Sequence, residues 1–209
     1  MRIIDSTVIL MNPPSYSTLL KTIEAAGRTC YKSEHLITKD SAEALVRKFI
    51  GWGHESALEH SAITVKFICD RGVSHEIVRH RIAAYSQEST RYCNYSKDGF
   101  GGEITVIKPS TFADYTEAYA TWEYACQCAE DMYFKLLDIG CTPQQARAVL
   151  PNSLKTELVM TANIREWRHF LKLRTDKAAH PDIRVVARKL LDLFKEWYPV
   201  FFEDISYDN

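Results

Sequence analysis

The stretch SAEALVRKFIGWGHESALEHSAITVKFICDRG, residues 41–72, joins a helical pattern directly to a strand pattern. Its first part repeats apolar residues at the spacing of one helix face, and these residues are Ala42, Leu45, Val46, Phe49 and Ile50. Asp40 or Ser41 is suited to cap this helix, and Gly51-Trp52-Gly53 is expected to break it. We therefore predict an amphipathic helix that begins near residue 41.

After His60 the period of the pattern changes to two. The apolar positions Ile63, Val65, Phe67 and Cys69 alternate with Thr64, Lys66 and Ile68. Such alternation predicts a strand with one well-buried face. Asp70-Arg71-Gly72 is expected to turn the chain, and Ser74 to cap a short helix over residues 75–80.

Further elements follow toward the carboxyl terminus. We predict a strand over residues 104–107, a long helix over 115–136, a short helix from Thr142-Pro143 through Arg147, a strand over 154–162, and helices over 163–175 and 181–197. The stripe of the long helix is more typical of a core than of a cofactor site, and it consists of Tyr115, Ala118, Tyr119, Trp122, Ala125, Cys126, Ala129, Met132, Tyr133 and Leu136.

Strands and helices thus come in blocks, without a regular alternation of single strands and helices. This order favours an α+β fold, with an antiparallel sheet packed with helices, over a doubly wound parallel sheet. The sequence contains no G-x-G-x-x-G and no G-x-x-x-x-G-K-[ST], so Rossmann and P-loop cofactor binding are disfavoured. No linker or repeat divides the chain, and we expect one domain over residues 1–209.

Composition and charge exclude several classes of protein. With 46% hydrophobic and 25% charged residues, the chain is neither disordered nor collagen-like. The 26 Lys and Arg against 27 Asp and Glu leave no basic excess for duplex nucleic acid, so any anion site must be local. The apolar run at residues 8–11 is too short for a signal peptide or a membrane span, and we expect a cytoplasmic protein.

The cysteines and histidines do not form a recognisable metal motif. None of the six cysteines stands in a C-x-x-C pair, so we expect reduced thiols and a packing role for Cys93. His54-Glu55 and His75-Glu76 resemble the start of a zinc-protease helix, but their partners His60 and His80 lie six and five residues on. A helix turns such partners roughly 240° and 140° away, and we predict no metal site.

The segment RHRIAAYSQESTRY, residues 79–92, has the strongest chemical character in the chain. It contains three arginines and one histidine against one glutamate, with hydroxyls at Ser86, Ser89 and Thr90. Guanidinium and hydroxyl groups near a turn bind phosphate well, but the same residues could form a solvated charged face. The two flanking arginines should disfavour the charged form of His80.

Two other arginines continue apolar patterns. Arg174 falls on the stripe of Trp167 and Leu171, so it either pairs with a carboxylate such as Asp176 or Glu157, or points into a ligand pocket. Arg147, before Val149-Leu150-Pro151, poses the same choice. Periodicity alone favours the salt bridge for both.

Arg79-His80-Arg81, followed by seven residues and Ser89, resembles the signature of the flavin-dependent thymidylate synthases. Further matches to this family are Gly53-His54-Glu55-Ser56 with Glu59-His60, the run from Ala146 to Pro151, Asn163, and Leu173-Arg174. The resemblance spans most of the chain in order and spacing.

The resemblance implies a homotetramer of α+β subunits, with active sites between subunits that each hold FAD. It implies conversion of dUMP to dTMP, with methylenetetrahydrofolate as the carbon donor and NADPH as the source of hydride. The family uses no enzyme cysteine for attack, which fits the lack of an activated cysteine pattern in this sequence. No nucleic acid or membrane partner is implied.

The resemblance also implies roles for individual residues. FAD would be bound by Ser56, Glu59, Arg79, His80, Arg81, Gln87, Asn163, Ile164, Arg165 and His169. The nucleotide would be bound by Glu76, Ile77, Val78, Arg79, Gln87, Glu88, Ser89, Thr90, Arg91, Arg147 and Arg174. His54 and Tyr92 would lie near the flavin and folate rings. Arg174 would be the catalytic cation at the pyrimidine edge, the reverse of the salt-bridge interpretation.

The sequence departs from the family pattern at a few positions. Ser86 and Gln87 stand where some relatives have Asn and Glu, Ala84 where Ser is frequent, and His169 in place of an Asn that meets the flavin. Two other functions stay open: a flavin-dependent methylase or hydroxymethylase of UMP or dUMP, and a non-catalytic nucleotide or single-stranded nucleic-acid binder that stacks bases on Tyr85, Tyr92 and Tyr95.

Overall fold

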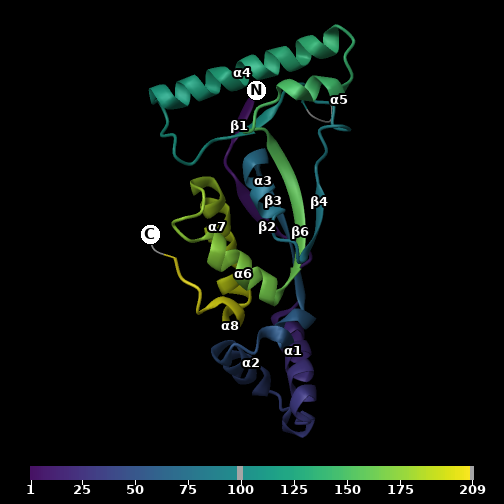
Figure 1. Ribbon diagram of the computed structural model, residues 1–209, viewed down its shortest axis with the longest axis vertical. Helices are drawn as coiled ribbons and strands as arrows, with labels where there is room; N and C mark the ends of the chain where they lie inside the picture. Colours follow the sequence, from purple (N-terminus) through teal and green to yellow (C-terminus); the bar gives the residue numbers. More distant parts are fainter. Residues whose placement is uncertain (98–100, 208–209) are drawn as a thin grey trace. The chain divides into compact units, whose positions relative to one another are not determined.

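The computed structural model describes residues 1–97 and 101–207 (Figure 1). The chain forms two compact units, each made of separate segments. Unit 1 contains Met1–Thr7, Phe67–Arg79 and Ser86–Leu158, and unit 2 contains Val8–Lys66, His80–Tyr85 and Val159–Asn209. The expectation of one domain over residues 1–209 stays a prediction.

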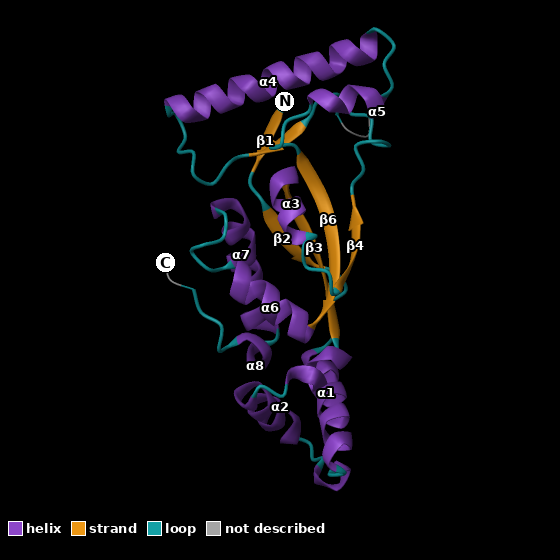
Figure 2. Cartoon of the chain, viewed as in Figure 1, coloured by secondary structure: helices purple, strands orange, loops and turns teal. Residues whose placement is uncertain are grey.

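Helices and strands are mixed in an α+β arrangement, as the block order indicates (Figure 2). The strands are β1 (Arg2–Ile4), β2 (Thr7–Leu10), β3 (Ala62–Asp70), β4 (Ala83–Gln87), β5 (Thr105–Ile107) and β6 (Lys155–Asn163). The α-helices are α1 (Tyr16–Tyr31), α2 (Ser41–Trp52), α3 (Arg71–Ile77), α4 (Glu117–Asp138), α5 (Pro143–Ala146), α6 (Ile164–Arg174), α7 (Pro181–Trp197) and α8 (Pro199–Phe202). Short 3₁₀ turns are η1 (Glu34–Leu36), η2 (Glu55–His60) and η4 (Arg147–Val149).

The described strands form two sheets. β2, β3, β6 and β4 are hydrogen-bonded in that order, with neighbouring strands running in opposite directions (Figure 2). This is the antiparallel sheet expected from the sequence. β1 and β5 form a separate parallel pair, with Arg2 opposite Thr105, which the sequence did not predict.

The helix and strand of residues 41–72 form as predicted, with small shifts at their ends. Ile63, Val65, Phe67 and Cys69 are all buried along β3. α2 continues through Gly51 and Trp52, and it ends at Gly53, whose φ of 72° is a left-handed conformation that glycine adopts without strain. The predicted break therefore falls at the last residue of the three.

The start of α3 differs from the prediction. β3 runs directly into this helix, because the Asp70 carboxylate accepts a hydrogen bond from the Val73 backbone N–H at 2.8 Å and caps it. Ser74, the predicted cap, lies inside the helix and donates to the Arg71 carbonyl. A Cβ at Gly72 would lie 2.6 Å from Asn152 Nδ2 and 2.9 Å from Asp70 Oδ1, so a larger residue would have to displace these side chains, including the one that caps α3.

The predicted stripe of α4 is only partly buried. Tyr115 lies before the helix and is exposed, and Thr116 provides the cap by accepting from the Tyr119 N–H. Tyr133 and Cys126 pack into the core of unit 1, whereas Met132 on the same stripe is largely exposed. The helical period was therefore correct, but burial of the whole stripe was wrong, since α4 covers its unit along only part of that face.

The two C-terminal helices form over the predicted residues. The Asn163 side chain caps α6 by accepting from the Glu166 N–H at 2.8 Å. Trp167 is fully buried among the rings of Phe170 and Phe194, and its indole N–H donates to the Ile63 carbonyl at 3.0 Å. No helix in the described ranges 1–97 and 101–207 combines the length and apolarity needed to cross a bilayer.

Candidate active site

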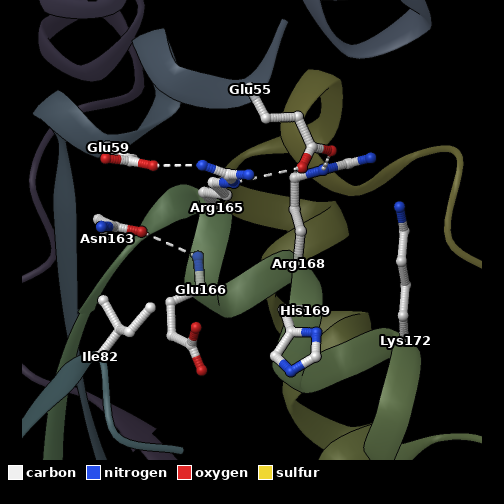
Figure 3. A pocket seen from close by; sticks show the side chains of 9 residues that line it. All are labelled: Glu55, Glu59, Ile82, Asn163, Arg165, Glu166, Arg168, His169 and Lys172. Atoms are coloured by element: carbon white, nitrogen blue, oxygen red, sulfur yellow. Dashed lines mark hydrogen bonds and ion pairs between the residues drawn. The ribbon is translucent and has the colours of Figure 1, made fainter. Parts of the chain in front are cut away.

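A cavity of about 480 Å³ opens beside the start of α6 in unit 2 (Figure 3). It is lined by Glu55, Glu59, Ile82, Asn163, Arg165, Glu166, Arg168, His169 and Lys172. The helical period places Arg165, His169 and Lys172 on one side of α6, and Asn163 sets where that helix begins. Four residues to which the resemblance assigns FAD binding, Glu59, Asn163, Arg165 and His169, thus meet at one cavity.

Ion pairs order the charged rim of this cavity. Arg165 Nη1 donates to the Glu59 carboxylate at 2.5 Å, and its Nε lies 3.7 Å from Glu55 (Figure 3). Arg168, only 2% exposed, binds both carboxylate oxygens of Asp204 at 2.6 and 2.7 Å. The two arginines offset the carboxylates of η2, so the rim carries both signs of charge.

His80 is buried, with 5% of its surface exposed, and it contacts two residues that line this cavity, Glu166 and His169. Its Nδ1 lies 2.9 Å from Glu166 Oε1, and its Nε2 accepts a hydrogen bond from Arg174 Nε at 3.1 Å. Phe170 packs edge-on against the imidazole, with ring centroids 4.8 Å apart. These contacts fix both the position and the orientation of the ring.

Burial lowers the pKa of His80 below its ordinary value of 6.5. The Glu166 hydrogen bond opposes this shift, while the positive charge of Arg174 adds to it. The sequence predicted the direction, but it assigned the cause to the flanking Arg79 and Arg81. Both of those arginines are exposed to solvent, which screens them, and so the cause was wrong.

His80, Glu166 and His169 also bring their potential metal-ligand atoms within 4.8 Å of one another. Both ring nitrogens of His80 are already hydrogen-bonded, one to Glu166 and the other to Arg174. A metal ion would have to displace one of these partners, since a ligand nitrogen needs its lone pair. The hydrogen bonds therefore disfavour a metal at this trio.

A second cavity of unit 2, about 370 Å³, contains Ser56 and His54 in its lining and shares Glu55 and Arg165 with the first. His54 Nδ1 lies 3.2 Å from the Tyr31 hydroxyl. Ile164 has a fully buried side chain and donates its backbone N–H to Ser61. A ligand could therefore meet Ile164 only through its backbone.

Unit 1 holds a third cavity, about 660 Å³, with a cationic lining. Its residues are Arg71, His75, Thr90, Gln144, Arg147, Ala148, Leu150, Pro151, Asn152 and Leu154. Arg147 Nη1 donates to the Thr90 hydroxyl at 3.2 Å, and Arg91 Nε donates to Gln144 at 3.1 Å. Three residues of the predicted nucleotide set, Thr90, Arg91 and Arg147, are thus brought together here.

The other residues of that set have more varied surroundings. The Glu88 carboxylate accepts from Lys155 at 2.9 Å, and the Gln87 amide donates to Ser74 at 2.9 Å. Ile77 is buried in α3, whereas Val78 and Arg79 are exposed. The Ser89 hydroxyl accepts a hydrogen bond from the Arg91 backbone N–H. Tyr92 is 80% exposed, and the Arg91 guanidinium lies over its ring. Glu76 is half-buried.

Sequence reasoning missed several residues that line these cavities. Glu55, Arg168, Lys172 and Glu166 lie in the unit 2 cavity, and Arg71, His75 and Gln144 in that of unit 1. One signal was available for Glu166, because a glutamate three residues after an N-cap asparagine is typical of a helix start. Cys93 has a pKa raised by burial and by Glu88, in keeping with a packing role.

Comparison with known proteins connects this chain to a family. The family model described as thymidylate synthase complementing protein matches residues 15–200. A flavin-dependent thymidylate synthase of Geobacter sulfurreducens is 37% identical over 189 residues, which are 87% of this chain and 80% of that protein. One from Pyrococcus abyssi is 34% identical over 180 residues, covering 83% and 73% of the two chains.

A solved structure supports the fold independently. The UMP/dUMP methylase PolB from Streptomyces cacaoi, crystallised with 5-Br dUMP, matches with a TM-score of 0.78 at 24% identity, over 97% of this chain and 96% of that one. Sequence motif, family model and full-length relatives therefore agree, and the chain belongs to the family of flavin-dependent thymidylate synthases.

Proposed function

We propose that the protein converts dUMP to dTMP by reductive methylation, with methylenetetrahydrofolate as carbon donor and FAD reduced by NADPH. The observation that carries this proposal is the meeting of Glu59, Asn163, Arg165 and His169 at one cavity, where the His169 ring lies 5.5 Å from the ring of the buried His80. Family membership supports a flavin as the cofactor.

The donor set of the unit 2 cavity fits FAD. A flavin dinucleotide presents a diphosphate and a ring edge of carbonyl and N–H groups, which require cations and mixed hydrogen-bonding groups respectively. Arg165 and Lys172 supply positive charge, and Asn163 and His169 supply amide and imidazole groups. In the same unit, Arg81 is exposed and could add charge, and Ser56, which lines the second cavity, could add a polar contact. We assign Arg79 and Gln87 to FAD from the family resemblance alone. When bound, the flavin supplies the hydride that reduces the transferred carbon to a methyl group.

The cavity of unit 1 fits the phosphate of a nucleoside monophosphate. Arg71, His75 and Arg147 line it, and the Thr90 hydroxyl is already oriented by Arg147. Charge-assisted hydrogen bonds from these groups would hold the phosphate and place the uracil ring, so binding energy remote from the reacting carbon serves orientation.

Arg174 supplies the cation that the chemistry of uracil requires. C5 of the ring is a weak nucleophile until negative charge builds through N3, C4 and O4, and a fixed guanidinium stabilises that charge. Arg174 is partly buried and held through Nε by His80, so it is fixed before the nucleotide binds. We propose Arg174 as the catalytic residue, with His54 and Tyr92 near the flavin and folate rings.

We further propose that the functional protein is a cytoplasmic homotetramer of single-domain subunits, with active sites between subunits and no nucleic-acid partner. The apolar side chains exposed on and beside α4 support self-association, since Tyr124 and Ile139 are 73% and 70% exposed. Mass measurement in solution tests the tetramer.

One alternative keeps the flavin and changes the product. The solved structure from Streptomyces cacaoi is described as a UMP/dUMP methylase, so methylation or hydroxymethylation of either nucleotide is the alternative that we retain. A non-catalytic nucleotide binder is a second alternative.

Purification followed by product analysis separates these functions. We expect the protein to be yellow as purified, to oxidise NADPH faster without oxygen when dUMP is present, and to yield dTMP by mass spectrometry. Colourless protein without NADPH oxidation would indicate a simple binder. Methylation of UMP in place of dUMP would show that the protein carries out the related reaction on the ribonucleotide. A product with the additional mass of one oxygen would show that it transfers a hydroxymethyl group.

Arg91→Ala is expected to weaken dUMP binding about ten- to hundredfold, because a charge-assisted hydrogen bond to phosphate contributes about 1.5–3 kcal/mol. The guanidinium is exposed and held by Gln144, so its loss should not unfold the protein. Isothermal titration measures the affinity. Arg47→Ala is the matched control, since Arg47 is an exposed arginine that pairs with Glu43 and Glu203 outside the three cavities described above. Equal affinities for dUMP in the two variants would refute the phosphate role of Arg91.

A further inference from the structure

Glu166, His80 and Arg174 form a continuous chain of hydrogen bonds in unit 2. Glu166 Oε1 lies 2.9 Å from His80 Nδ1, and His80 Nε2 lies 3.1 Å from Arg174 Nε. Glu166 and His80 are 7% and 5% exposed, so water does not substitute for these contacts. The functional proposal gives Arg174 a direct role and leaves Glu166 without one.

The donor and acceptor of each hydrogen bond between Glu166, His80 and Arg174 follow from the chemistry of the Arg174 guanidinium. A guanidinium donates hydrogen bonds and cannot accept them, so His80 Nε2 must accept with its lone pair. The imidazole is then the neutral tautomer that carries its hydrogen on Nδ1. That N–H donates to Glu166, whose carboxylate oxygen accepts. The chemistry of Arg174 thus assigns the tautomer of His80 and the part taken by Glu166.

We propose that Glu166 is a positioning residue for Arg174, acting through His80 to hold the guanidinium in one orientation. A guanidinium is planar and rigid, so fixing Nε sets the direction of the whole group. This inference rests on the proposed function, since it explains how the cation at the pyrimidine edge is fixed in advance. Preorganisation of this kind is the main source of electrostatic stabilisation in enzymes.

Neighbouring residues hold Glu166 and His80 in the positions that these hydrogen bonds require. The Glu166 backbone is fixed by the Asn163 cap, and the Phe170 ring packs against the imidazole. The Tyr85 hydroxyl donates to the His80 carbonyl at 2.5 Å, which anchors the backbone of that residue. Burial keeps His80 neutral by lowering its pKa, as the acceptor role of Nε2 requires.

Glu166→Met tests the positioning role, because it removes the acceptor and keeps most of the side-chain volume. We expect turnover of dUMP to fall about a hundredfold, which is the loss of rate that a small misplacement of a catalytic group can cause. Glu166→Gln retains an acceptor oxygen and is expected to recover most of that loss. In an Arg174→Ala background, Glu166→Met should change turnover less than about twofold, because the two residues act as one unit.

Glu24→Met is the matched control, since Glu24 is a buried glutamate that binds Arg28 and Ser41 away from the site. We expect it to lower stability while leaving turnover unchanged per folded molecule. Equal effects of Glu166→Met in the parent and in the Arg174→Ala background would overturn the proposal.

A second readout does not depend on activity. Nitrogen-15 NMR of the full-length protein is expected to show His80 with its hydrogen on Nδ1. Glu166→Met is expected to weaken this preference, because only the Arg174 donor then favours that tautomer. A wild-type tautomer with the hydrogen on Nε2 would overturn the inference. If the parent protein forms no dTMP, the proposed function fails, while the tautomer and its response to Glu166→Met still decide the hydrogen-bond chain.

Turnover is also expected to fall in acid, as His80 gains a proton and Nε2 can no longer accept from Arg174. The charged or titratable groups that face the imidazole are Glu166, His169 and Arg174, and the Tyr85 hydroxyl donates to the His80 backbone carbonyl. Because the pKa of folded His80 is lowered, this loss should lie below pH 6.5. The unfolded chain binds the proton at higher pH, so stability falls over the same window.

The pH–rate profile of His80→Gln is the control for this titration. Glutamine can donate to Glu166 and accept from Arg174 without titrating, so its acid limb should disappear or move. An acid limb at the same pH in His80→Gln would show that another group titrates and would contradict this assignment.

Discussion

Arg174→Ala is expected to lower the rate of dTMP formation by about two to three orders of magnitude, the effect of removing one fixed donor from a site of developing negative charge. The guanidinium is held by His80 through Nε at 3.1 Å, so alanine removes both the charge and its fixed orientation. Single-turnover measurement of dTMP under anaerobic conditions gives the rate. Flavin retention, read from visible absorbance, should be unchanged, because Arg174 is absent from the lining of the cavity assigned to FAD.

Arg174→Lys separates charge from geometry in the same experiment. Lysine keeps one positive charge but lacks the planar group that His80 orients, so we expect only partial recovery of the rate. An Arg174→Ala rate within a few-fold of the parent would remove Arg174 from the mechanism. Loss of flavin from this variant would instead place the arginine in the cofactor site.

Trp167→Ala is expected to lower the free energy of unfolding by about 3–5 kcal/mol, the usual cost of truncating a buried aromatic side chain. Trp167 is fully buried between Phe170 and Phe194, and its N–H satisfies the Ile63 carbonyl at 3.0 Å. Urea unfolding followed by circular dichroism measures the change. A loss below about 1 kcal/mol would contradict tight packing under α6.

Trp167→Phe separates the two contributions of the indole to stability, namely burial of its ring and its hydrogen bond to the Ile63 carbonyl. Phenylalanine keeps most of the buried ring but leaves the Ile63 carbonyl without its donor, so we expect a smaller loss of about 1–3 kcal/mol. The comparison bears on function, because α6 carries Arg165, His169 and Arg174. Variants that loosen the helix should misplace these groups together.

Local patterns predicted most of the elements that surround the site. The alternation along β3 and the helices predicted from residues 142, 163 and 181 rest on short-range features, and each element forms where its pattern indicates. The start of α3 was wrong because two residues, Asp70 and Ser74, are both suitable caps. In the structure Asp70 is the cap, and the first residue of the helix, Arg71, donates its N–H to the carbonyl of Asn152, a residue far away in the sequence.

Several elements had no expectation at all, namely β1, β2, α1, β4 and α8. α1 was not predicted, and β4 lies within the arginine-rich segment, which was interpreted for its chemistry rather than its backbone. The burial pattern of β4 alternates only between exposed and intermediate, so its sequence lacks the strong period that marks β3. Hydrogen bonding within the sheet decides its conformation.

The candidate site divides in the same way between sequence and structure. The sequence alone was sufficient to identify the motif from Arg79 to Arg91 and the family resemblance, because charge and hydroxyl content are properties of residue type. By contrast, the partner of Arg174 was expected among carboxylates, and the structure places His80 at its Nε. These residues are 94 apart in the sequence, beyond the reach of any periodicity.

The sequence by itself thus determined the class of fold, the family and the groups available for chemistry, because helical and strand periods and functional groups are local properties of the chain. Only the tertiary structure decided which of those groups meet. It buried His80, placed Glu166 on one side of the imidazole and Arg174 on the other, and thereby assigned a hydrogen to Nδ1. The physical reason is that a hydrogen bond depends on distance and direction in space, which separation along the chain does not encode.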